Sequence, residues 1–377
     1  MEQNTIIGKQ LEEVCRRFRI PGTLIFWKQL TSGNINTTYK VRCAHEQRET
    51  SYLVQKVNMY VFKDPVRMMH NIDLITSHIM KKNEANGITD RRSRLHFHHT
   101  KDGKNYVFLE EEGEQGFWRL SNYIEDALSF DESNDPKVLR MAGKAFGRFE
   151  AQLSDFDAGT LFETIPDFHD TRRRLETFFR HVEEDPCRRC DSVRDEIEII
   201  AKARDFACQL NEKLDSGELS CRVTHNDTKT NNVLFDKDTL EPVIVIDLDT
   251  VMPGLAAHDF GDTVRFAANT AAEDEKDVSK VSLDLDLFRA FAEGYIGETA
   301  GFLTEAELDS MSLGAVTITL ELASRFLDDY ITGDKYFKTC YPGHNLVRAR
   351  CQLALYQDMM RKYEEMNRIV HEVAAKR

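Results

Sequence analysis

The sequence predicts an α+β protein of two lobes: a smaller N-terminal lobe built on an antiparallel sheet with one packed helix, and a larger, mainly helical C-terminal lobe. Three observations predict this division. The chain has 377 residues, more than the roughly 100–200 residues of an ordinary domain. Residues 23–125 alternate short β-branched or aromatic runs with turns. Beyond residue 125, apolar residues recur at three- and four-residue steps, as in amphipathic helices. We therefore expect lobes at residues 1–125 and 126–377.

The expected strands of the first lobe are short runs separated by turn residues, and KDGKN at residues 101–105 is typical of a hairpin turn between two of them. One segment in the middle of the lobe breaks this pattern, because its apolar residues Met68, Ile72, Ile75 and Ile79 recur at helical spacing. This spacing predicts the packed helix. The runs expected to form strands are TLIFWKQL, TYKVRCA, SYLVQKVN, RLHFHH, YVFLEEE and FWRLSNYI.

Two strand-like pieces interrupt the helical texture of the second lobe, NVLFD and PVIVIDLD. The segment DKDTLEP between them is rich in turn residues. We expect these pieces to pair as two short antiparallel strands, which would bring the residue before Val233 close to those after Ile246.

Composition excludes several classes of protein. Lys plus Arg total 50 against 64 for Asp plus Glu, a net charge of −14, which argues against the basic surface of a nucleic-acid binder. The start lacks the apolar core of a signal peptide, and no run approaches the ~18 apolar residues of a membrane span. We expect a cytoplasmic, monomeric protein without a membrane partner, whose 8 cysteines are reduced thiols.

Polar side chains gather around the two strands of the second lobe. In VTHNDTKTNNVLFD, Asp227 and Asn232 come just before the first strand, and Asp247 ends the second. Carboxylate and amide oxygens are the ligands that Mg²⁺ prefers. If the strands pair, Asn232 and Asp247 are placed to bind such a cation, and Asp227 stays available to orient or deprotonate a hydroxyl group.

The spacing His-x-Asp-x-x-x-x-Asn, followed by an aspartate at a strand end, resembles the catalytic and metal-binding loops of protein kinases. With His-Asn-Asp and Ile-Asp-Leu-Asp in these places, the sequence is more similar to the aminoglycoside phosphotransferase and choline kinase group of small-molecule kinases. This resemblance implies a bilobal protein-kinase-like fold that uses ATP and Mg²⁺. No GxxxxGK[ST] motif of a P-loop kinase is present.

The resemblance also assigns the N-terminal lobe to nucleotide binding. Gly33, in LTSGNINTTYKVR, could cover phosphates with backbone N–H groups, although the loop lacks a G-x-G-x-x-G pattern. Lys56 lies in a strand where an inward ammonium would bind the α- and β-phosphates, with Asp73 as its possible acidic partner. The adenine is expected on backbone groups of the segment that follows the last strand: Asn122, Tyr123 and Ile124.

Several longer segments resemble the N-acetylhexosamine 1-kinases of the same superfamily, over about residues 23–357: HNDTKTNNVLFD, VIDLDTVMPGLAAHDFGDTVRF and ELASRFLDDYITGDKYFKTCYPGHNLVRARCQLAL. This likeness implies phosphorylation of the 1-hydroxyl of N-acetylglucosamine or N-acetylgalactosamine by ATP. It implies that Asp227 is the catalytic base in contact with the sugar, that Asn232 and Asp247 bind Mg²⁺, and that Asp259 braces the catalytic loop. Arg325 and Tyr336 would bind the sugar, and we expect His225 to support the loop backbone.

Two alternatives to a sugar kinase stay open at this stage. A kinase of the same fold could act on another hydroxyl acceptor, such as choline, an amino alcohol, homoserine, methylthioribose or an aminoglycoside. Arg325 distinguishes a sugar acceptor from a cationic one, because a guanidinium repels a cationic acceptor and accommodates a neutral sugar. A nucleotide-binding module without catalysis is the other alternative, although Asp227, Asn232 and Asp247 are all retained.

Overall fold

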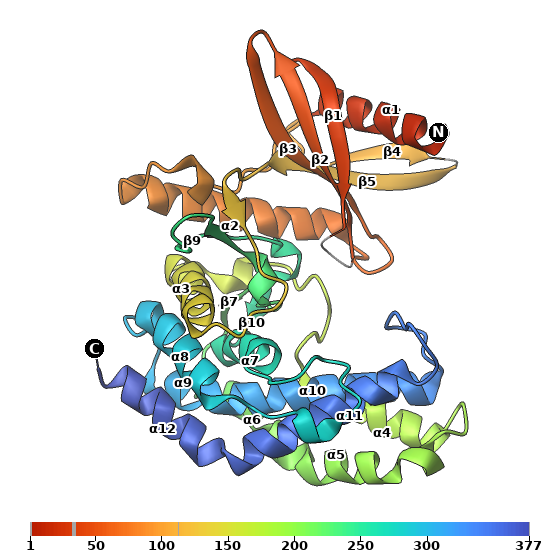
Figure 1. Ribbon diagram of the computed structural model, residues 1–377, viewed down its shortest axis with the longest axis vertical. Coiled ribbons are helices and arrows are strands. Elements are labelled where there is room, and N and C mark those ends of the chain that lie inside the picture. Colours follow the sequence, from red (N-terminus) through yellow and green to blue (C-terminus); the bar gives the residue numbers. More distant parts are fainter. Residues whose placement is uncertain (1, 32–34, 112, 377) are drawn as a thin grey trace. The chain divides into compact units, whose positions relative to one another are not determined.

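The computed structural model describes residues 2–31, 35–111 and 113–376 (Figure 1). The chain forms two compact units. The first unit consists of Met1–Ala127 with two later segments, Thr160–Ile165 and Ile246–Val251. The second unit consists of Leu128–Gly159, Pro166–Val245 and Met252–Arg377. Each unit is described by itself below.

The first unit contains the predicted antiparallel sheet, which is confirmed. Its five strands follow the order β1-β2-β3-β5-β4 and all neighbours pair antiparallel. The strands are β1 (Thr23–Leu30), β2 (Thr37–His45), β3 (Arg48–Val57), β4 (Val107–Glu111) and β5 (Glu114–Asn122). The RLHFHH run is not a full strand, since it makes only an isolated bridge from Phe97 to Ser121. KDGKN accordingly forms a local turn, closed by the Thr100 amide on the Lys104 carbonyl at 2.8 Å, and joins no hairpin.

Two helices belong to the first unit. The predicted helix is α2 (Pro65–Ala85), and it buries Met68, Ile72 and Ile75. Asp64 caps its N-terminus, because the Asp64 side chain accepts a hydrogen bond from the Arg67 amide at 3.0 Å. A second helix, α1 (Glu2–Arg17), was not predicted. Leu11, Val14 and Cys15 of this helix, and Phe18 just beyond it, belong to the hydrophobic core of the sheet. The sheet contributes Tyr39, Val41, Val54 and Trp118 to the same core.

Buried polar contacts attach the later segments to the first unit. Arg119 of β5 forms a buried ion pair with Asp249, and its Nε donates to Gln55 at 2.9 Å. Asn71 of α2 donates to the carbonyls of Phe162 at 2.7 Å and Val251 at 3.0 Å. Breaking a buried ion pair leaves an uncompensated charge and costs about 3–5 kcal/mol. These contacts therefore fix the position of residues 246–251 within the unit.

The second unit is mainly helical, as predicted. Its helices are α3 (Pro136–Leu153), α4 (Thr171–Glu184), α5 (Arg194–Ala207), α6 (Gln209–Asp215), α7 (Ala256–Ala267), α8 (Leu285–Thr299), α9 (Glu305–Asp309), α10 (Met311–Thr332), α11 (His344–Arg361) and α12 (Tyr363–Ala374). Its short strands pair as β7 (Arg222–Thr224) with β10 (Met252–Gly254), and β8 (Val233–Asp236) with β9 (Pro242–Val245). The strand β6 (Ala127–Leu128) spans the division between the units. None of the helices in the described ranges is apolar over a length that could cross a membrane.

Helix α10 is the central helix of the second unit and packs against α7, α11 and α4 (Figure 1). It is buried on nearly all sides, and its buried residues include polar ones such as Thr317, Thr319 and Glu321. Glycines allow the close approach of α10 to α7: a Cβ on Gly314 would lie 1.9 Å from the Ala257 carbonyl oxygen, and one on Gly261 would lie 2.5 Å from the Gly314 backbone. This tight contact places the start of α7 beside the loop that follows β7.

Candidate functional site

The loop between β7 and β8 carries the predicted catalytic residues. The expected strand pair is confirmed, with Val233 opposite Val245 in the register of β8 and β9. Asn232 therefore ends the loop directly before β8, at the last position of a short 3₁₀ turn, Thr230–Asn232. Asp227 lies in the middle of the loop.

Asp259, in the first turn of α7, binds the backbone of this loop. Its two carboxylate oxygens accept hydrogen bonds from the amides of His225 at 2.6 Å and Asn226 at 2.7 Å. Asn226 has a left-handed backbone conformation, with φ 61°, which costs free energy in a residue other than glycine and needs support from its surroundings. Burial raises the pKa of Asp259 to about 6, against the opposing effect of His225 and the two amides.

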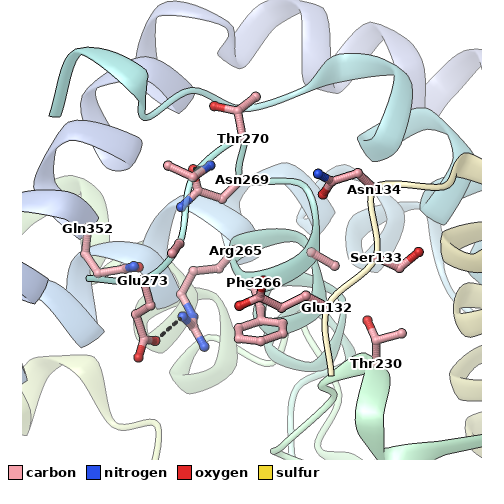
Figure 2. Close-up of a pocket in the computed structure, with 13 residues that line it drawn as sticks. Glu132, Ser133, Asn134, Thr230, Arg265, Phe266, Asn269, Thr270, Glu273 and Gln352 are labelled. Carbon is pink, nitrogen blue, oxygen red and sulfur yellow. Dashed lines mark hydrogen bonds and ion pairs between the residues drawn. The ribbon is translucent and has the colours of Figure 1, made fainter. Parts of the chain in front are cut away.

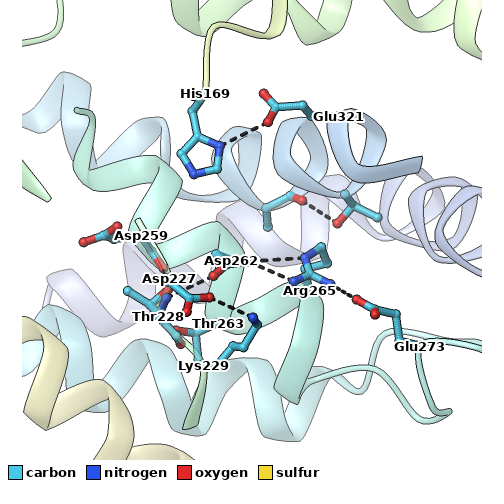
Figure 3. Close-up of polar contacts among 12 residues, drawn as sticks. His169, Asp227, Thr228, Lys229, Asp259, Asp262, Thr263, Arg265, Glu273 and Glu321 are labelled. Atoms are coloured by element: carbon cyan, nitrogen blue, oxygen red, sulfur yellow. Dashed lines mark hydrogen bonds and ion pairs between the residues drawn. The ribbon is translucent and has the colours of Figure 1, made fainter. Parts of the chain in front are cut away.

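A second aspartate of the same helix face, Asp262, was not foreseen from the sequence. It accepts a hydrogen bond from the Thr228 amide at 3.0 Å, and the Thr228 hydroxyl donates to the Asp259 carbonyl at 2.6 Å. Arg265 in turn pairs with Asp262 at 2.9 Å and with Glu273 at 3.1 Å (Figure 3). The spacing Asp-x-x-Asp in HDFGD was the available signal, since residues three apart share one helix face.

His225 occupies the aromatic interior beneath the loop. Its ring is fully buried and makes edge contacts with Phe146 at 5.6 Å and Phe149 at 5.8 Å, both on α3. Its Nδ1 accepts a hydrogen bond from the Asp227 amide at 3.3 Å. The imidazole thus links the helical core to the backbone of Asp227 and lies below the loop.

The carboxylate of Asp227 has two side-chain partners. Lys229 Nζ lies 2.9 Å from one carboxylate oxygen, and Asn232 Nδ2 donates to the other at 3.1 Å and to the Asp227 carbonyl at 2.8 Å. Figure 3 shows the Lys229 side chain directed at the carboxylate of Asp227. Burial alone would raise the pKa of Asp227, but the Lys229 ammonium, His225 and Asn232 together hold that pKa below its usual value. Asp227 is therefore a charged acceptor at neutral pH.

Asn232 fits a cation site of the kind the sequence predicts. Because its NH₂ group donates to Asp227, its amide oxygen is directed away from that carboxylate. Asp247 belongs to the first unit and is the second residue after β9. It adopts a left-handed conformation, φ 61° and ψ 58°, in a residue other than glycine. Strain of this kind is common at functional sites, and the contacts of Asp249 and Val251 hold the segment that carries it.

The predicted sugar-binding residues Arg325 and Tyr336 line one pocket of the second unit, together with Arg174, Phe178, Asp328 and Phe337. Arg325 lies over the rings of Phe168 at 5.6 Å and Phe337 at 5.7 Å, and Tyr336 is 65% exposed. Burial, with a smaller effect from Arg325, lowers the pKa of Arg174. The Arg174 Nε atom is buried and has no hydrogen-bond partner among the described residues.

A chain of contacts connects this pocket to the loop that carries Asp227. His258 precedes the brace residue Asp259, and its ring lies 5.2 Å from that of His169. His169 Nδ1 is 3.1 Å from Glu321, one helical turn before Arg325 on α10. Figure 3 shows His169 and Glu321 in one view with Asp227 and Asp259. The pocket and Asp227 therefore belong to one continuous part of the second unit.

The chain is similar to known proteins in sequence and in fold. The model of the phosphotransferase enzyme family (APH) matches residues 27–292, which is more than half of the chain. The chain belongs to this family. Its fold is similar to that of a microcompartment-associated aminopropanol kinase (13% identity, 96% of this chain and 98% of that one, TM-score 0.59). It is also similar to that of an amicoumacin kinase solved with AMP-PNP and Ca²⁺ (13% identity, 94% of this chain and 96% of that one, TM-score 0.58). A third similar structure is choline kinase from Cryptosporidium parvum (13% identity, 96% of each chain, TM-score 0.52).

The nucleotide residues predicted for this phosphotransferase lie in the first unit, except that Gly33 lies outside the described residues. Lys56 is on β3, opposite Trp118 of β5, with its ammonium 5.9 Å from the centre of that ring. Asp73, considered as its partner, lies 3.1 Å from His99 Nε2. The Asn122 amide donates to the His96 carbonyl at 3.1 Å and the Tyr123 amide to Ser51 at 3.4 Å. Both amides are thus used within the unit, and Ile124 follows them.

Proposed function

We propose that this phosphotransferase transfers the γ-phosphoryl group of ATP to the 1-hydroxyl of an N-acetylhexosamine, N-acetylglucosamine or N-acetylgalactosamine. The observation that carries the proposal is the state of Asp227. Its carboxylate is held by Lys229 and Asn232 on a loop whose backbone is fixed by Asp259. A charged acceptor at a fixed position is what phosphoryl transfer to a hydroxyl needs, because most of the rate enhancement comes from positioning and charge stabilisation.

In this proposal Asp227 accepts the hydrogen bond of the sugar hydroxyl and takes its proton as the phosphoryl group is transferred. Mg²⁺, when bound, would neutralise charge on the ATP phosphates, and Asn232 and Asp247 are its proposed ligands. Lys56 is proposed to bind the α- and β-phosphates, Gly33 to cover them, and the backbone from Asn122 to Ile124 to hold the adenine. Because Asn122 and Tyr123 already use their amides, Ile124 is the preferred donor.

The pocket of Arg174 and Arg325 supports a sugar acceptor over an amine. Its two aspartates are already engaged: Asp328 lies 2.7 Å from His181, and Asp329 accepts the amides of residues 335–337 at 2.8 Å each. Arg174 Nη2 donates to the Phe168 carbonyl at 3.3 Å, and its Nε has no partner among the described residues. A guanidinium group repels a cation and offers hydrogen-bond donors to a neutral ligand. Hydroxyl and acetamido oxygens of an N-acetylhexosamine are suitable acceptors for these donors, and Tyr336 offers a flat ring beside them.

A second candidate is a kinase for an amino alcohol, because an aminopropanol kinase and a choline kinase share this fold. At 13% identity these structures establish the fold alone. The guanidinium groups of Arg174 and Arg325 count against this acceptor, whereas Asp328 and Asp329 in the same lining balance their charge.

The experiment is an acceptor panel with ATP and Mg²⁺, read by release of ADP. The panel contains N-acetylglucosamine, N-acetylgalactosamine, glucose, glucosamine, choline, aminopropanol, homoserine, methylthioribose and an aminoglycoside. We expect turnover of the two N-acetylhexosamines, and NMR of the product should place phosphate on the anomeric oxygen. Turnover of choline or aminopropanol without the N-acetylhexosamines would overturn the choice of acceptor. Asp227→Asn is the control that separates true transfer from contaminating ATP hydrolysis.

A further inference from the structure

The loop that follows α10 supplies two aromatic side chains, Tyr336 and Phe337, to the pocket of Arg174 and Arg325. Gly333, with φ 106°, ends the helix and turns the chain into this loop. The stretch from there to the start of α11 belongs to no helix or strand. The positions of the two rings therefore depend on side-chain contacts that hold the loop.

Asp329, near the end of α10, holds this loop through four hydrogen bonds. One carboxylate oxygen accepts the amides of Lys335 and Tyr336, and the other accepts the amide of Phe337 and Nδ2 of Asn345, all at 2.8 Å. Successive backbone amides that converge in this way form a binding site for an anion. The carboxylate of Asp329, which is only 4% exposed, occupies that site and fixes the backbone on both sides of Tyr336.

A second carboxylate of the loop is tied to the same group. Asn345 of α11 is fully buried, and its Nδ2 also donates to Asp334 at 2.9 Å. Asp334 has a left-handed backbone conformation, with φ 58°, and its other oxygen accepts a hydrogen bond from Arg189 at 2.7 Å. Such a conformation persists in a residue other than glycine when the surroundings support it. One buried amide thus links Asp329 to the start of the loop.

The rings that this network places are in contact with the proposed acceptor-binding arginine. The Phe337 ring lies 4.6 Å from that of Phe326 and 4.8 Å from that of Tyr336. The guanidinium of Arg325 lies 5.7 Å from the centre of the Phe337 ring, within the range of a cation–π contact. A shift of the amides that Asp329 holds would therefore move both rings relative to Arg325.

We propose that Asp329 is a positioning residue for the acceptor: by fixing Tyr336 and Phe337 against Arg325, it sets the affinity of the pocket. The inference rests on the proposed function, in which this pocket receives the acceptor. Four donors already fill the acceptor capacity of a carboxylate. Asp329 therefore acts through the loop and makes no hydrogen bond to the acceptor.

Steady-state kinetics of Asp329→Asn test the proposal. The new NH₂ group cannot accept the loop amides, so the KM for N-acetylglucosamine should rise about ten-fold or more. The kcat and the KM for ATP should stay close to wild type, because loss of binding common to the ground and transition states raises KM alone. A merely structural role would reduce the amount of folded enzyme, which lowers the apparent kcat and leaves KM unchanged.

Hydrogen exchange provides a second measurement on the same variant. The amides of residues 335–337 should exchange faster in Asp329→Asn than in wild type, because they lose their acceptor. Asp358→Asn is the matched control. Asp358 is also a buried aspartate that accepts a loop amide, that of Leu283 at 2.8 Å, but it lies outside this pocket. Its replacement should leave the KM for N-acetylglucosamine unchanged.

A second pocket of the same unit provides a control for the place of acceptor binding. Its lining includes Glu132, Thr230 and Arg265, and it shares no residue with the pocket of Arg325 (Figure 2). Glu132→Gln removes one exposed charge from this second pocket. The KM for N-acetylglucosamine should not change in this variant.

Three results would overturn the proposal: faster exchange of the three amides with an unchanged acceptor KM, an equal rise of KM in Asp358→Asn, or a rise in Glu132→Gln alone. If Asp329→Asn does not fold, Asp334→Asn takes its place, because asparagine tolerates the left-handed conformation. It should raise the same KM about two- to ten-fold, and an unchanged KM would refute the proposal.

Failure of the proposed function is a separate result. It would appear in the acceptor panel as turnover of another acceptor without the N-acetylhexosamines. That acceptor would then replace N-acetylglucosamine in the comparison of Asp329→Asn with Asp358→Asn, and the same rise of KM is expected.

Discussion

Lys229 Nζ and Asp227 Oδ1 lie 2.9 Å apart within the loop of residues 225–232, which also contains Asn232. The pair raises the pKa of Lys229, chiefly through the charge of Asp227, and counters the effect of burial on the carboxylate. Lys229 thus acts as an internal counter-charge for Asp227. The consequence is that the partly buried carboxylate of Asp227, the proposed catalytic base, stays ionised.

Replacement of Lys229 by Met should change the pH dependence of the enzyme. The pKa of Asp227 is held below its ordinary value of 3.8, so its contribution to stability and activity is present above that pH and is lost only as the pH falls through the lowered pKa. Without the ammonium, burial dominates and the pKa rises. The acid limb of the kcat/KM profile should therefore move to higher pH. Lys202→Met, at an exposed site on α5, is the control, and an unmoved acid limb in Lys229→Met would refute the pairing.

Asp227→Asn should lower kcat by about 10²–10⁴-fold, the range typical of a lost general base. The amide keeps the shape of the side chain, so the loop and the binding of ATP should survive. Single-turnover kinetics and calorimetry with an ATP analogue separate the two effects. Asp236→Asn, at the turn that follows β8, provides a matched control with near-normal activity. Near-normal activity of Asp227→Asn itself is the result that rules out the base assignment.

Asp259→Asn tests the brace of the loop. One of the two oxygens that accept the amides of His225 and Asn226 becomes an NH₂ group, which cannot accept. Loss of one charge-assisted bond, about 1.5–3 kcal/mol, predicts a fall in kcat of roughly 10- to 100-fold. Unchanged kcat would show that the loop does not need this brace.

Asp259→Asn should also change how the free energy of unfolding depends on pH. The raised pKa of Asp259, about 6, means that its contribution to stability is fully present below 3.8 and is lost as the pH rises through about 6. Wild-type protein should therefore lose unfolding free energy relative to Asp259→Asn across this interval, measured by urea denaturation. A difference that is constant with pH would argue against a perturbed Asp259.

Arg174→Ala and Arg325→Ala should each raise the KM for N-acetylglucosamine about 10- to 100-fold, because each removes charged donors worth roughly 1.5–3 kcal/mol. The KM for ATP should change little. Arg180→Ala, at an exposed position of α4 outside the pocket, is the matched control. Equal effects of Arg174→Ala and Arg180→Ala would remove Arg174 from the acceptor site.

Gly314→Ala should destabilise the second unit by about 1–3 kcal/mol or more. The added Cβ would meet the Ala257 carbonyl oxygen at 1.9 Å, so α7 and α10 must move apart. Gly297→Ala, in α8 with nothing within 4 Å of the new Cβ, should instead stabilise the protein by roughly 0.5–1 kcal/mol. Urea denaturation of both variants measures the contrast, and equal stabilities would contradict the packing.

The fold could be predicted where a local pattern decides the structure. Met68, Ile72 and Ile75 repeat at helical spacing and are buried on α2, and the two strands around DKDTLEP pair as expected. Helix α1 was missed because its apolar face consists of a few residues, including Leu11 and Val14, among many polar ones. RLHFHH has the composition of a strand and its backbone bonds to the end of β5 at Leu120 and Asn122, but this pairing is a single bridge, because β4 pairs with the earlier part of β5.

The sequence by itself determined the α+β class and the phosphotransferase-like spacing of Asp227, Asn232 and Asp247, because these depend on local patterns in the chain, whereas the role of Asp259 was implied by the family resemblance. Tertiary structure alone decided that Asp262 supports Thr228, that Arg119 pairs with Asp249 130 residues away, and that Arg174 joins Arg325 in one pocket. Such pairs depend on how helices and strands pack. Packing is set by the total burial and polar satisfaction of the folded chain, which no local periodicity encodes.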